Sequence, residues 1–455
     1  SDVYKWQGDE GKGKIVDVLT SNYDIIARFQ GGPNAGHTLE FDGIKHVLHQ
    51  IPSGIFREDK HNIIGNGVVL DPVIFMNEVS QIHKKFNINL KEILSISTRA
   101  QLISPVHRLL DKVLEENKGE KKIGSTLKGI GPTYQDKIGR HGLRVGEVLS
   151  NNFKEKYNKQ KAYHDYFLEG HYNENFLKEE EKFFESINEL KKFKILDTEY
   201  LINKNVRNKK KILAEGAQGT LLDIDFGSYP FVTSSNTTTA GACIGLGISP
   251  KKIGKVFGIF KAYCTRVGAG PFPTELFDDT GKKIATNGNE FGSTTGRPRR
   301  CGWLDAVLLS HSVYLNGIEG ICLTKIDVLD GLEKIKICSD YSSALTREEI
   351  LESMSLDDVE PQYIELDGWQ QSTAGIQNFN DLNDLFFSAL AKKQEDRHSK
   401  FKDKYQHIPY LNSSLFERSS LENDTIEISA LNDEAIEAVS YTHLRAHETV
   451  LDLVC

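Results

Sequence analysis

The chain has 455 residues, with 56 lysines and arginines against 64 aspartates and glutamates, and a formal net charge of −8. This balance argues against a broad basic surface for nucleic acid or for an anionic membrane, although local basic clusters can still bind phosphate. No run approaches the roughly 18 apolar residues of a membrane-spanning helix, and the first residues lack the pattern of a signal peptide. The six cysteines form no CxxC pair, so we expect reduced thiols and a cytoplasmic protein.

Short apolar runs alternate with glycine-rich turns through the first part of the chain. They lie at residues 24–32, 61–72, 211–219, 255–263 and 320–331. A repeat of strand, glycine turn and helix is typical of an α/β fold with a mostly parallel central sheet flanked by helices. We therefore predict a single α/β catalytic domain over residues 1–375. Asp71 and Pro72 predict the N-cap and first turn of one of its helices.

Three later segments differ from this pattern. Residues 151–210 carry charged segments with apolar residues three and four apart, which predicts a helical excursion over the sheet. None of the 38 glycines lies after Gly375, so we expect residues 376–439 to form a divergent C-terminal segment. Residues 440–455, SYTHLRAHETVLDLVC, look like translated non-native sequence, and we assign them no function.

The first motif is GDEGKGK, from Gly8 to Lys14, which has the GxxxxGK spacing of a phosphate-binding loop. Glycines let backbone N–H groups converge on an anion, and lysine neutralises its charge. Ile15 stands where such loops keep the hydroxyl that holds magnesium. An acidic residue inside the loop must then contact the metal, and Asp9 is the candidate. The alternative is an ordinary glycine- and lysine-rich turn.

The second motif, GGPNAGHT at residues 31–38, follows the apolar run IIARF. It places Asn34, His37 and Thr38 at the carboxyl end of a strand, where ligands of α/β sheets bind. Since glycines flank His37, we expect a loop histidine that is not buried on an apolar face. Near Asp9 it would complete an acid/base pair, in which the carboxylate removes a proton and the imidazole donates one to a developing oxyanion. The alternative is a structural histidine.

Further loops combine hydroxyl, amide and basic side chains. GSTTGRPRR at 292–300 predicts an anion pocket, with a solvated surface loop as the alternative. GSTLKGIGP at 124–132 has a similar composition and precedes Arg140, while EGAQGT at 215–220 places Gln218 in a turn where its amide can read a base edge. In LTKID, Asp327 can accept hydrogen bonds from guanine N1–H and its 2-amino group, which favours GTP over ATP.

Together these motifs resemble the adenylosuccinate synthetase family over roughly residues 6–370. The segments that carry the resemblance are, in order, WQGDEGKGK, GGPNAGHT, IGNGVV, GSTLKGIGP, EGAQGTLLDID, YPFVTSSNTT, TRVGAGPFPTEL, GNEFGSTTGRPRR and LTKIDVLDGL. The resemblance implies a P-loop-related fold and a ligase that joins IMP to L-aspartate with GTP and Mg2+. The products would be adenylosuccinate, GDP and phosphate, in the first committed step of AMP synthesis from IMP.

The resemblance also implies roles for individual residues. Asp9 would be the general base on N1 of IMP and would bind Mg2+ together with the carbonyl of Gly36. The residues expected in catalysis are Asp9, His37, Lys12 and Gln218. Those expected to bind IMP and aspartate are Asn34, Thr126, Arg140, Gln218, Thr233, Val267, Ser293, Thr294, Thr295 and Arg297. Those expected to bind GTP are Gly8, Glu10, Gly11, Lys12, Gly13, Lys14, Gly36, Thr38, Arg299, Lys325 and Asp327. Arg140 would complete the IMP site of the neighbouring subunit of a homodimer.

Both ends depart from the family pattern. SDVYK precedes WQGDEGKGK, in which Trp6 and Gln7 are transposed, so we expect a truncated or replaced first strand. The glycine-free tail cannot supply the family's Gly-Pro-x-Arg segment, which helps to enclose guanine, so we expect a nucleotide pocket that is open on one side. The alternative function is a catalytically impaired nucleotide-binding homologue or a GTPase-like switch. A switch would not need GSTTGRPRR or the loop of Asn34 and His37, and these favour the ligase.

Overall fold

The computed structural model describes residues 12–41, 44–119, 125–291, 298–342, 359–370, 372–373 and 436–441. Its centre is an eight-stranded sheet in which every pair of neighbours is parallel. The strand order is β14 (Gly320–Thr324), β10 (Ile253–Lys261), β17 (Ile436–Tyr441), β9 (Ile212–Glu215), β1 (Ile25–Arg28), β4 (His61–Ile64), β6 (Leu94–Ser97) and β8 (Lys194–Leu196). The predicted mostly parallel α/β sheet is confirmed.

The central strands are apolar because both faces of the sheet are covered. Alternate residues of β1 enter different cores: Ile25 packs with α8 (Thr198–Arg207) and α9 (Thr239–Leu246), whereas Ile26 packs with Val16 of α1 (Lys12–Thr20). Helices therefore lie on both faces, as the sequence predicts. The carboxyl ends of β1, β9 and β10 meet at one edge, where the loops that follow them can form a site.

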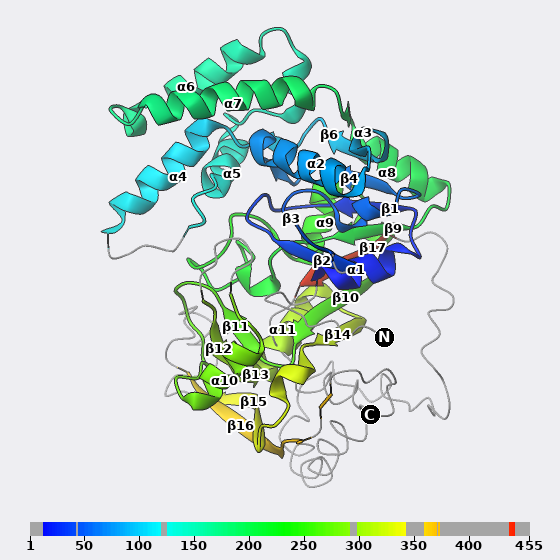
Figure 1. The fold of residues 1–455 in the computed structure, drawn as a ribbon, viewed down its shortest axis with the longest axis vertical. Helices are drawn as coiled ribbons and strands as arrows, with labels where there is room; N and C mark the ends of the chain where they lie inside the picture. Colours follow the sequence, from blue (N-terminus) through cyan, green and yellow to red (C-terminus); the bar gives the residue numbers. More distant parts are fainter. Residues whose placement is uncertain are drawn as a thin grey trace.

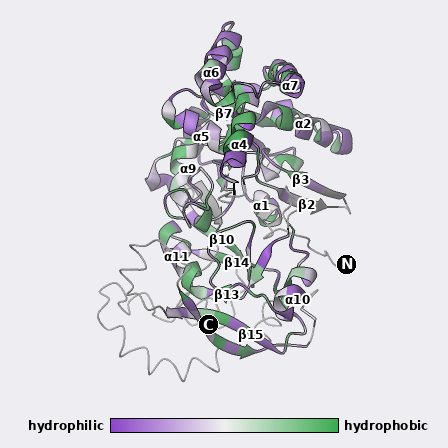
Figure 2. Ribbon diagram, turned by 90° about the vertical axis from the view of Figure 1, so that its left-hand side faces the viewer, coloured by the Kyte–Doolittle hydropathy of each residue, from purple (hydrophilic) through white to green (hydrophobic). Residues whose placement is uncertain are grey.

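Helices form one end of the molecule (Figure 1). They are α2 (Pro72–Phe86), α3 (Leu90–Ile93), α4 (Pro105–Asn117), α5 (Ile130–Gly139), α6 (Phe153–Leu168) and α7 (Glu174–Leu190). Asp71 caps α2, since its carboxylate accepts hydrogen bonds from two backbone N–H groups of the first turn, and Pro72 opens the helix as predicted. Hydrophilic and hydrophobic residues mix around α6 and α7, as expected for helices that cover a core on one side (Figure 2). Residues 151–210 thus contain α6, α7 and α8.

Smaller sheets form the opposite end (Figure 1). β11 (Cys264–Arg266) pairs with β12 (Arg300–Gly302), and β15 (Lys334–Ser342) lies between β13 (Leu304–Asp305) and β16 (Glu360–Asp367). α10 (Asp279–Asn287) and α11 (Ala306–Asn316) pack on them, around a second apolar core. Beside the central sheet lie the hairpin of β2 (His37–Phe41) and β3 (Ile44–Leu48), and the pair β5 (Val69–Leu70) and β7 (Gln101–Leu102).

Strand β17 comes from the C-terminal part of the chain. It lies between β9 and β10 in the interior of the sheet and is parallel to both. Its last two residues, Ser440 and Tyr441, open the segment that the sequence assigns to a non-native tail. The expected change to the first strand falls on residues 1–11, outside the described residues.

Two further observations concern the described part of the chain. Its cysteines are free thiols, as expected, and they are Cys243, Cys264, Cys301, Cys322 and Cys338. Among its helices, none combines the length and the apolar character that crossing a bilayer requires.

Candidate functional site

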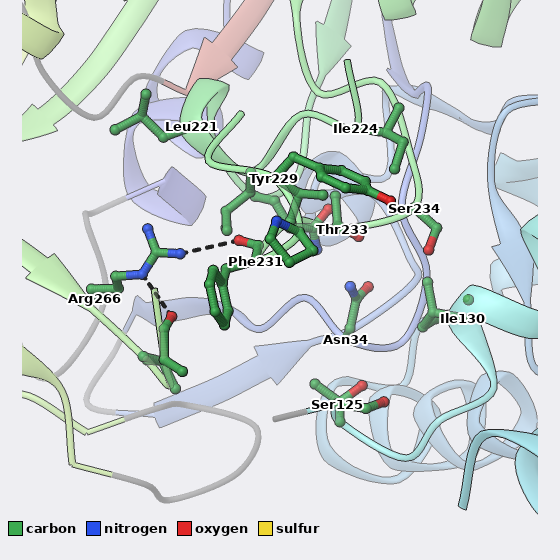
Figure 3. Close-up of a pocket in the computed structure, with 18 of the residues that line it drawn as sticks. Asn34, Ser125, Ile130, Leu221, Ile224, Tyr229, Phe231, Thr233, Ser234 and Arg266 are labelled. Atoms are coloured by element: carbon green, nitrogen blue, oxygen red, sulfur yellow. Dashed lines mark hydrogen bonds between the residues drawn. The ribbon is translucent and has the colours of Figure 1, made fainter. Parts of the chain in front are cut away.

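A cavity of about 620 Å³ lies at the carboxyl edge of the central sheet (Figure 3). Loops that follow β1, β9 and β10 line it, together with the start of α5 and residues 229–234. Residues of the predicted site that line it are Asn34, Gly36, Thr126, Gln218, Thr233, Val267 and Arg299. Segments far apart in the sequence are therefore brought together as the resemblance implies.

His37 is the first residue of β2, so the expectation that it lies in a loop is wrong; it is fully buried, but against polar partners and not on an apolar face. Its Nδ1 lies 2.5 Å from Oε1 of Glu215, the last residue of β9. Ser53 donates to the same carboxylate, from its hydroxyl to Oε1 at 2.7 Å and from its backbone N–H to Oε2 at 2.8 Å. The burial is possible because a carboxylate, contributed by a strand 178 residues away, satisfies the imidazole.

Glu215 fixes the orientation of the histidine ring. Burial alone would raise its pKa, but the charge and hydrogen bond of His37, the charge of Arg28 and the Ser53 N–H together lower it. Glu215 is therefore ionised and can only accept, so the Nδ1–H of His37 donates to it. Nε2 is then the ring nitrogen at which a proton can be gained or given up. Sequence reasoning placed Glu215 at the start of EGAQG but assigned it no role.

Arg28 is a second site residue that sequence reasoning missed. It stands opposite Glu215 in the parallel register of β1 and β9, and its side chain is fully buried. In the described part of the chain its three guanidinium nitrogens have no hydrogen-bond partner. A buried cation in this position stabilises ionised Glu215.

The phosphate-loop motif leads into the N-terminus of α1. A Cβ on Gly13 would lie 2.7 Å from the carbonyl oxygen of Thr38, so the first turn of α1 packs against β2 closely enough to require glycine. Free N–H groups at a helix N-terminus attract anions. Gly8, Asp9, Glu10 and Gly11 lie outside the described residues, as do the side chains of Lys12 and Lys14.

The loop that carries Thr126 is held by two carboxylates of α4. Asp111 accepts from the Ser125 hydroxyl at 2.7 Å and from the Gly129 N–H at 2.9 Å, while Glu115 accepts from the Ser125 N–H at 3.1 Å. These bonds fix the loop on both sides of Thr126. Asp111 and Glu115 look like ordinary polar positions of an amphipathic helix, and the sequence carries no signal for their role.

Gln218 reaches the cavity from the turn after β9. It has a left-handed backbone, with φ of 61°, and its Oε1 is buried without a hydrogen-bond partner in the described chain. An amide oxygen in that state can accept from a ligand. Gly31 makes room for it, since a Cβ there would lie 3.0 Å from this oxygen.

Arg266 braces the side of the cavity near Val267, which is 41% exposed. It donates to the carbonyl of Ala269 at 3.0 Å and to the carbonyl of Phe231 at 3.1 Å (Figure 3). It therefore ties the loop after β11 to the loop of Thr233. The residues predicted to bind the substrate aspartate lie outside the described residues; they are Ser293, Thr294, Thr295 and Arg297.

Lys325 and Asp327, the expected guanine contacts, lie beyond the lining of the cavity. Lys325 precedes the 3₁₀ helix η6 (Ile326–Leu329), and its ammonium donates to the Gly288 carbonyl at 2.7 Å and to Glu290 Oε1 at 2.8 Å. Asp327 is exposed. The lysine ammonium therefore points into the protein and its side chain is almost fully buried, so Asp327 is the residue of this pair that is exposed to meet a base.

Arg140 is exposed and forms the C-cap of α5 in a left-handed conformation, with φ of 65°. Ile138, 79% exposed, and Tyr163, 55% exposed, lie close by, since His141 stacks on the Tyr163 ring at 3.9 Å. A guanidinium beside exposed apolar side chains is typical of a protein interface.

A buried cluster ties α5 to α4 and α6. The carboxylate of Asp136 accepts from Nε2 of His107 at 2.9 Å and from Nε2 of His164 at 3.0 Å. Burial alone would raise the Asp136 pKa, but the two histidines hold it well below its usual range. Although this grouping could hold a metal, His107 Nδ1 accepts from the Ser104 N–H, so its Nε2 carries the proton and donates. The cluster is a hydrogen-bonded anchor beneath Arg140.

Comparisons with known proteins give matches over most of the chain. The adenylosuccinate synthetase family model matches residues 4–392, and a domain of unknown function (DUF7814) matches residues 368–452. The adenylosuccinate synthetase of Flavobacterium johnsoniae is 57% identical over 379 residues, which cover 82% of this chain and 89% of that protein. That of Bacteroides fragilis is 56% identical over 389 residues, covering 85% and 92%.

Solved structures show the same similarity. A fully ligated adenylosuccinate synthetase from Plasmodium falciparum aligns with a TM-score of 0.75 and 39% identity, covering 83% of this chain and 90% of that one. A cyanophage succinoaminodeoxyadenylate synthetase, at 24% identity and a TM-score of 0.51, shares the fold.

Proposed function

The chain belongs to the adenylosuccinate synthetase family, and we propose that it ligates IMP to L-aspartate with GTP, forming adenylosuccinate, GDP and phosphate. The observation that carries the proposal is the cavity itself. Asn34, Thr126, Gln218 and Thr233 line it together with Val267, on loops of five separate segments. A nucleotide switch needs a site for its nucleotide alone. A ligase with two further substrates also needs a cavity that can hold them, separate from the guanine contacts.

The chemistry follows from IMP, whose 6-oxygen is a poor leaving group. Phosphorylation of that oxygen requires removal of the N1 proton, which we assign to Asp9, and neutralisation of charge at the transferring phosphate. His37 lies directly after Gly36, which lines the cavity, and Glu215 holds its ring so that Nε2 can deliver a proton to a developing oxyanion. The amine of aspartate then attacks C6 and displaces phosphate.

Lys12 and the N-terminus of α1 are the proposed phosphate contacts. Magnesium prefers oxygen ligands, and the proposed donors, the carboxylate of Asp9 and the carbonyl of Gly36, fit it. Gly13 of the phosphate-loop motif packs closely on Thr38, two residues after Gly36, which supports the pairing of these donors. When bound, the metal would neutralise charge on the phosphate oxygens.

We further propose a homodimer in which Arg140 completes the IMP site of the neighbouring subunit. Its exposure beside Ile138 and Tyr163 supports an interface there, and Asp136 anchors the helix that presents it. Because the substrates are purine nucleotides and an amino acid, we propose the cytoplasm as the site of the reaction.

The test is purified protein with GTP, Mg2+, IMP and aspartate, followed by the ultraviolet change as adenylosuccinate forms. We expect product only when all three substrates are present. Hydrolysis of GTP at the same rate without IMP and aspartate would instead support the GTPase-like switch. GTP binding without any turnover would support the impaired homologue.

A further inference from the structure

Glu290 follows α10, directly before residues 291–298, and its side chain is fully buried. Its Oε2 accepts from Lys261 Nζ at 2.9 Å and from Arg299 Nη1 at 3.0 Å. Its Oε1 accepts from Lys325 Nζ at 2.8 Å and from the Tyr263 hydroxyl. Burial alone would raise the Glu290 pKa, but the charges of Lys261, Lys325 and Arg299 lower it to about 2, so the carboxylate is ionised.

One of these cations, Lys325, is part of the TKID turn at residues 324–327. Lys325 has a left-handed backbone, with φ of 58°, and its side chain is 3% exposed. Its ammonium is bound to Glu290 and to the Gly288 carbonyl. A left-handed lysine is strained and persists only where its surroundings hold it. Glu290 therefore helps to hold the turn that presents Asp327 two residues later.

A second of these cations, Arg299, lies close to where residues 292–297 leave and rejoin the described chain. The backbone N–H of Arg299 donates to the Glu290 carbonyl at 2.9 Å, and Phe291 and Pro298 form a β-bridge next to it. The guanidinium of Arg299 also binds the Glu290 carboxylate, and Arg299 lines the cavity. Glu290 thus holds both the main chain and a side chain where that loop begins and ends.

Three cations of the cluster converge on one carboxylate. Lys261, Lys325 and Arg299 contribute three cations against the single carboxylate of Glu290. Lys261 is fully buried and also donates to the hydroxyl of Thr265 at 3.0 Å. Since like charges repel strongly at low dielectric, removal of the carboxylate should drive these side chains apart.

We propose that Glu290 is a positioning residue that couples the guanine-reading turn to the aspartate loop, so that affinity for GTP and for aspartate depends on one carboxylate. The assignment of substrates to the two loops rests on the proposed function. The hydrogen bonds of Glu290 that join the two loops are observed whatever the function is.

The test compares Glu290→Gln with Glu180→Gln. Glu180 is a matched control because it also accepts from a tyrosine and a lysine, Tyr157 at 2.8 Å and Lys161 at 2.9 Å. It lies on α7 and bonds to α6, in the helical end of the molecule. Calorimetry would measure GTP binding to each protein alone, and kinetics would give KM for the three substrates. In Glu290→Gln we expect GTP affinity and aspartate KM each to worsen by about ten- to hundred-fold, with IMP KM and every constant of the control unchanged.

Unchanged GTP affinity and aspartate KM in Glu290→Gln would overturn the proposal, as would an equal loss for all three substrates. If Glu290→Gln does not fold, Glu290→Asp keeps the charge and withdraws it by one methylene. A Tm near that of the unmutated protein with weaker GTP and aspartate binding supports the coupling, and unaltered affinities in that variant overturn it. Unmutated protein that binds GTP but forms no adenylosuccinate would refute the proposed function and leave the GTP comparison valid.

Discussion

Replacing Glu215 by Gln tests the assignment of His37 most directly. The pair is fully buried with 2.5 Å between Nδ1 and Oε1, so the substitution removes a charge-assisted bond worth about 1.5–3 kcal/mol. The neutral amide can also present its NH2 group to Nδ1, which would move the ring proton to Nε2 in every molecule. The histidine could then no longer cycle a proton at that nitrogen, and we expect kcat to fall on the order of 10²–10⁴-fold.

The assay is adenylosuccinate formation, with kcat and KM determined separately. Ser53→Ala is the control, because it removes the 2.7 Å hydroxyl donor from Glu215 and keeps the carboxylate charge. The hydroxyl donates to a charged group, a bond worth about 1.5 kcal/mol or more, but Glu215 keeps its charge and its bond to His37, so this variant should lose about tenfold. If Glu215→Gln retained the activity of Ser53→Ala, the ionised carboxylate would have no special role and the reasoning would be refuted.

Three further predictions concern other parts of the site. Arg140→Leu should raise the IMP KM by roughly ten- to hundred-fold through loss of a charged donor, and mixing it with Asp9→Asn should restore part of the activity if subunits share sites. Monomeric sedimentation at all IMP concentrations would exclude this arrangement. Asp136→Asn should lower the free energy of unfolding at pH 7, because the Asp136 pKa is depressed in the folded state. The contribution of the Asp136 carboxylate to stability is fully present above the unfolded pKa of about 3.9 and fades as pH falls below that value. Denaturant unfolding across pH would test this, and a difference from the unmutated protein that persists undiminished at pH 2 would contradict it. Asp327→Asn should erode the preference for GTP over ATP and improve binding of the xanthine nucleotide, whose 2-oxo edge suits an amide; calorimetry with the three nucleotides decides, and equal GTP and ATP affinity in the unmutated protein would remove the TKID assignment.

The sequence predicted those features of the fold and site that depend on local patterns. Apolar runs before glycine turns identified β1, β9, β10 and β14, and Asp71 with Pro72 identified the start of α2. The loops of Asn34, Thr126 and Gln218 were found because runs of small, polar and glycine residues are a local signal. The loops of Asn34 and Gln218 meet because the parallel strands β1 and β9 end at one edge, whereas the loop of Thr126 follows α4.

The burial of His37 could not be predicted in this way. Its flanking glycines suggested a loop, but β2 pairs with β3, and the imidazole lies next to the Ser53 hydroxyl and bonds to Glu215. Whether a polar side chain can be buried depends on its partner, and this partner is 178 residues distant. A sequence window around His37 contains no trace of it.

A common physical cause explains four of the residues that sequence reasoning missed. Glu215, Glu290, Asp111 and Asp136 are carboxylates that accept several donors from segments distant in the sequence. Irregular loops cannot satisfy their own backbone groups as helices and strands do, so a buried carboxylate with several lone pairs is an efficient means of fixing one. The pKa values of Glu215, Glu290 and Asp136 are lowered because cations or hydrogen-bond donors surround these carboxylates, which are therefore sensitive to neutral substitution. The residues that most need testing are consequently not those that contact substrate but the buried acids that hold the contacting residues in place.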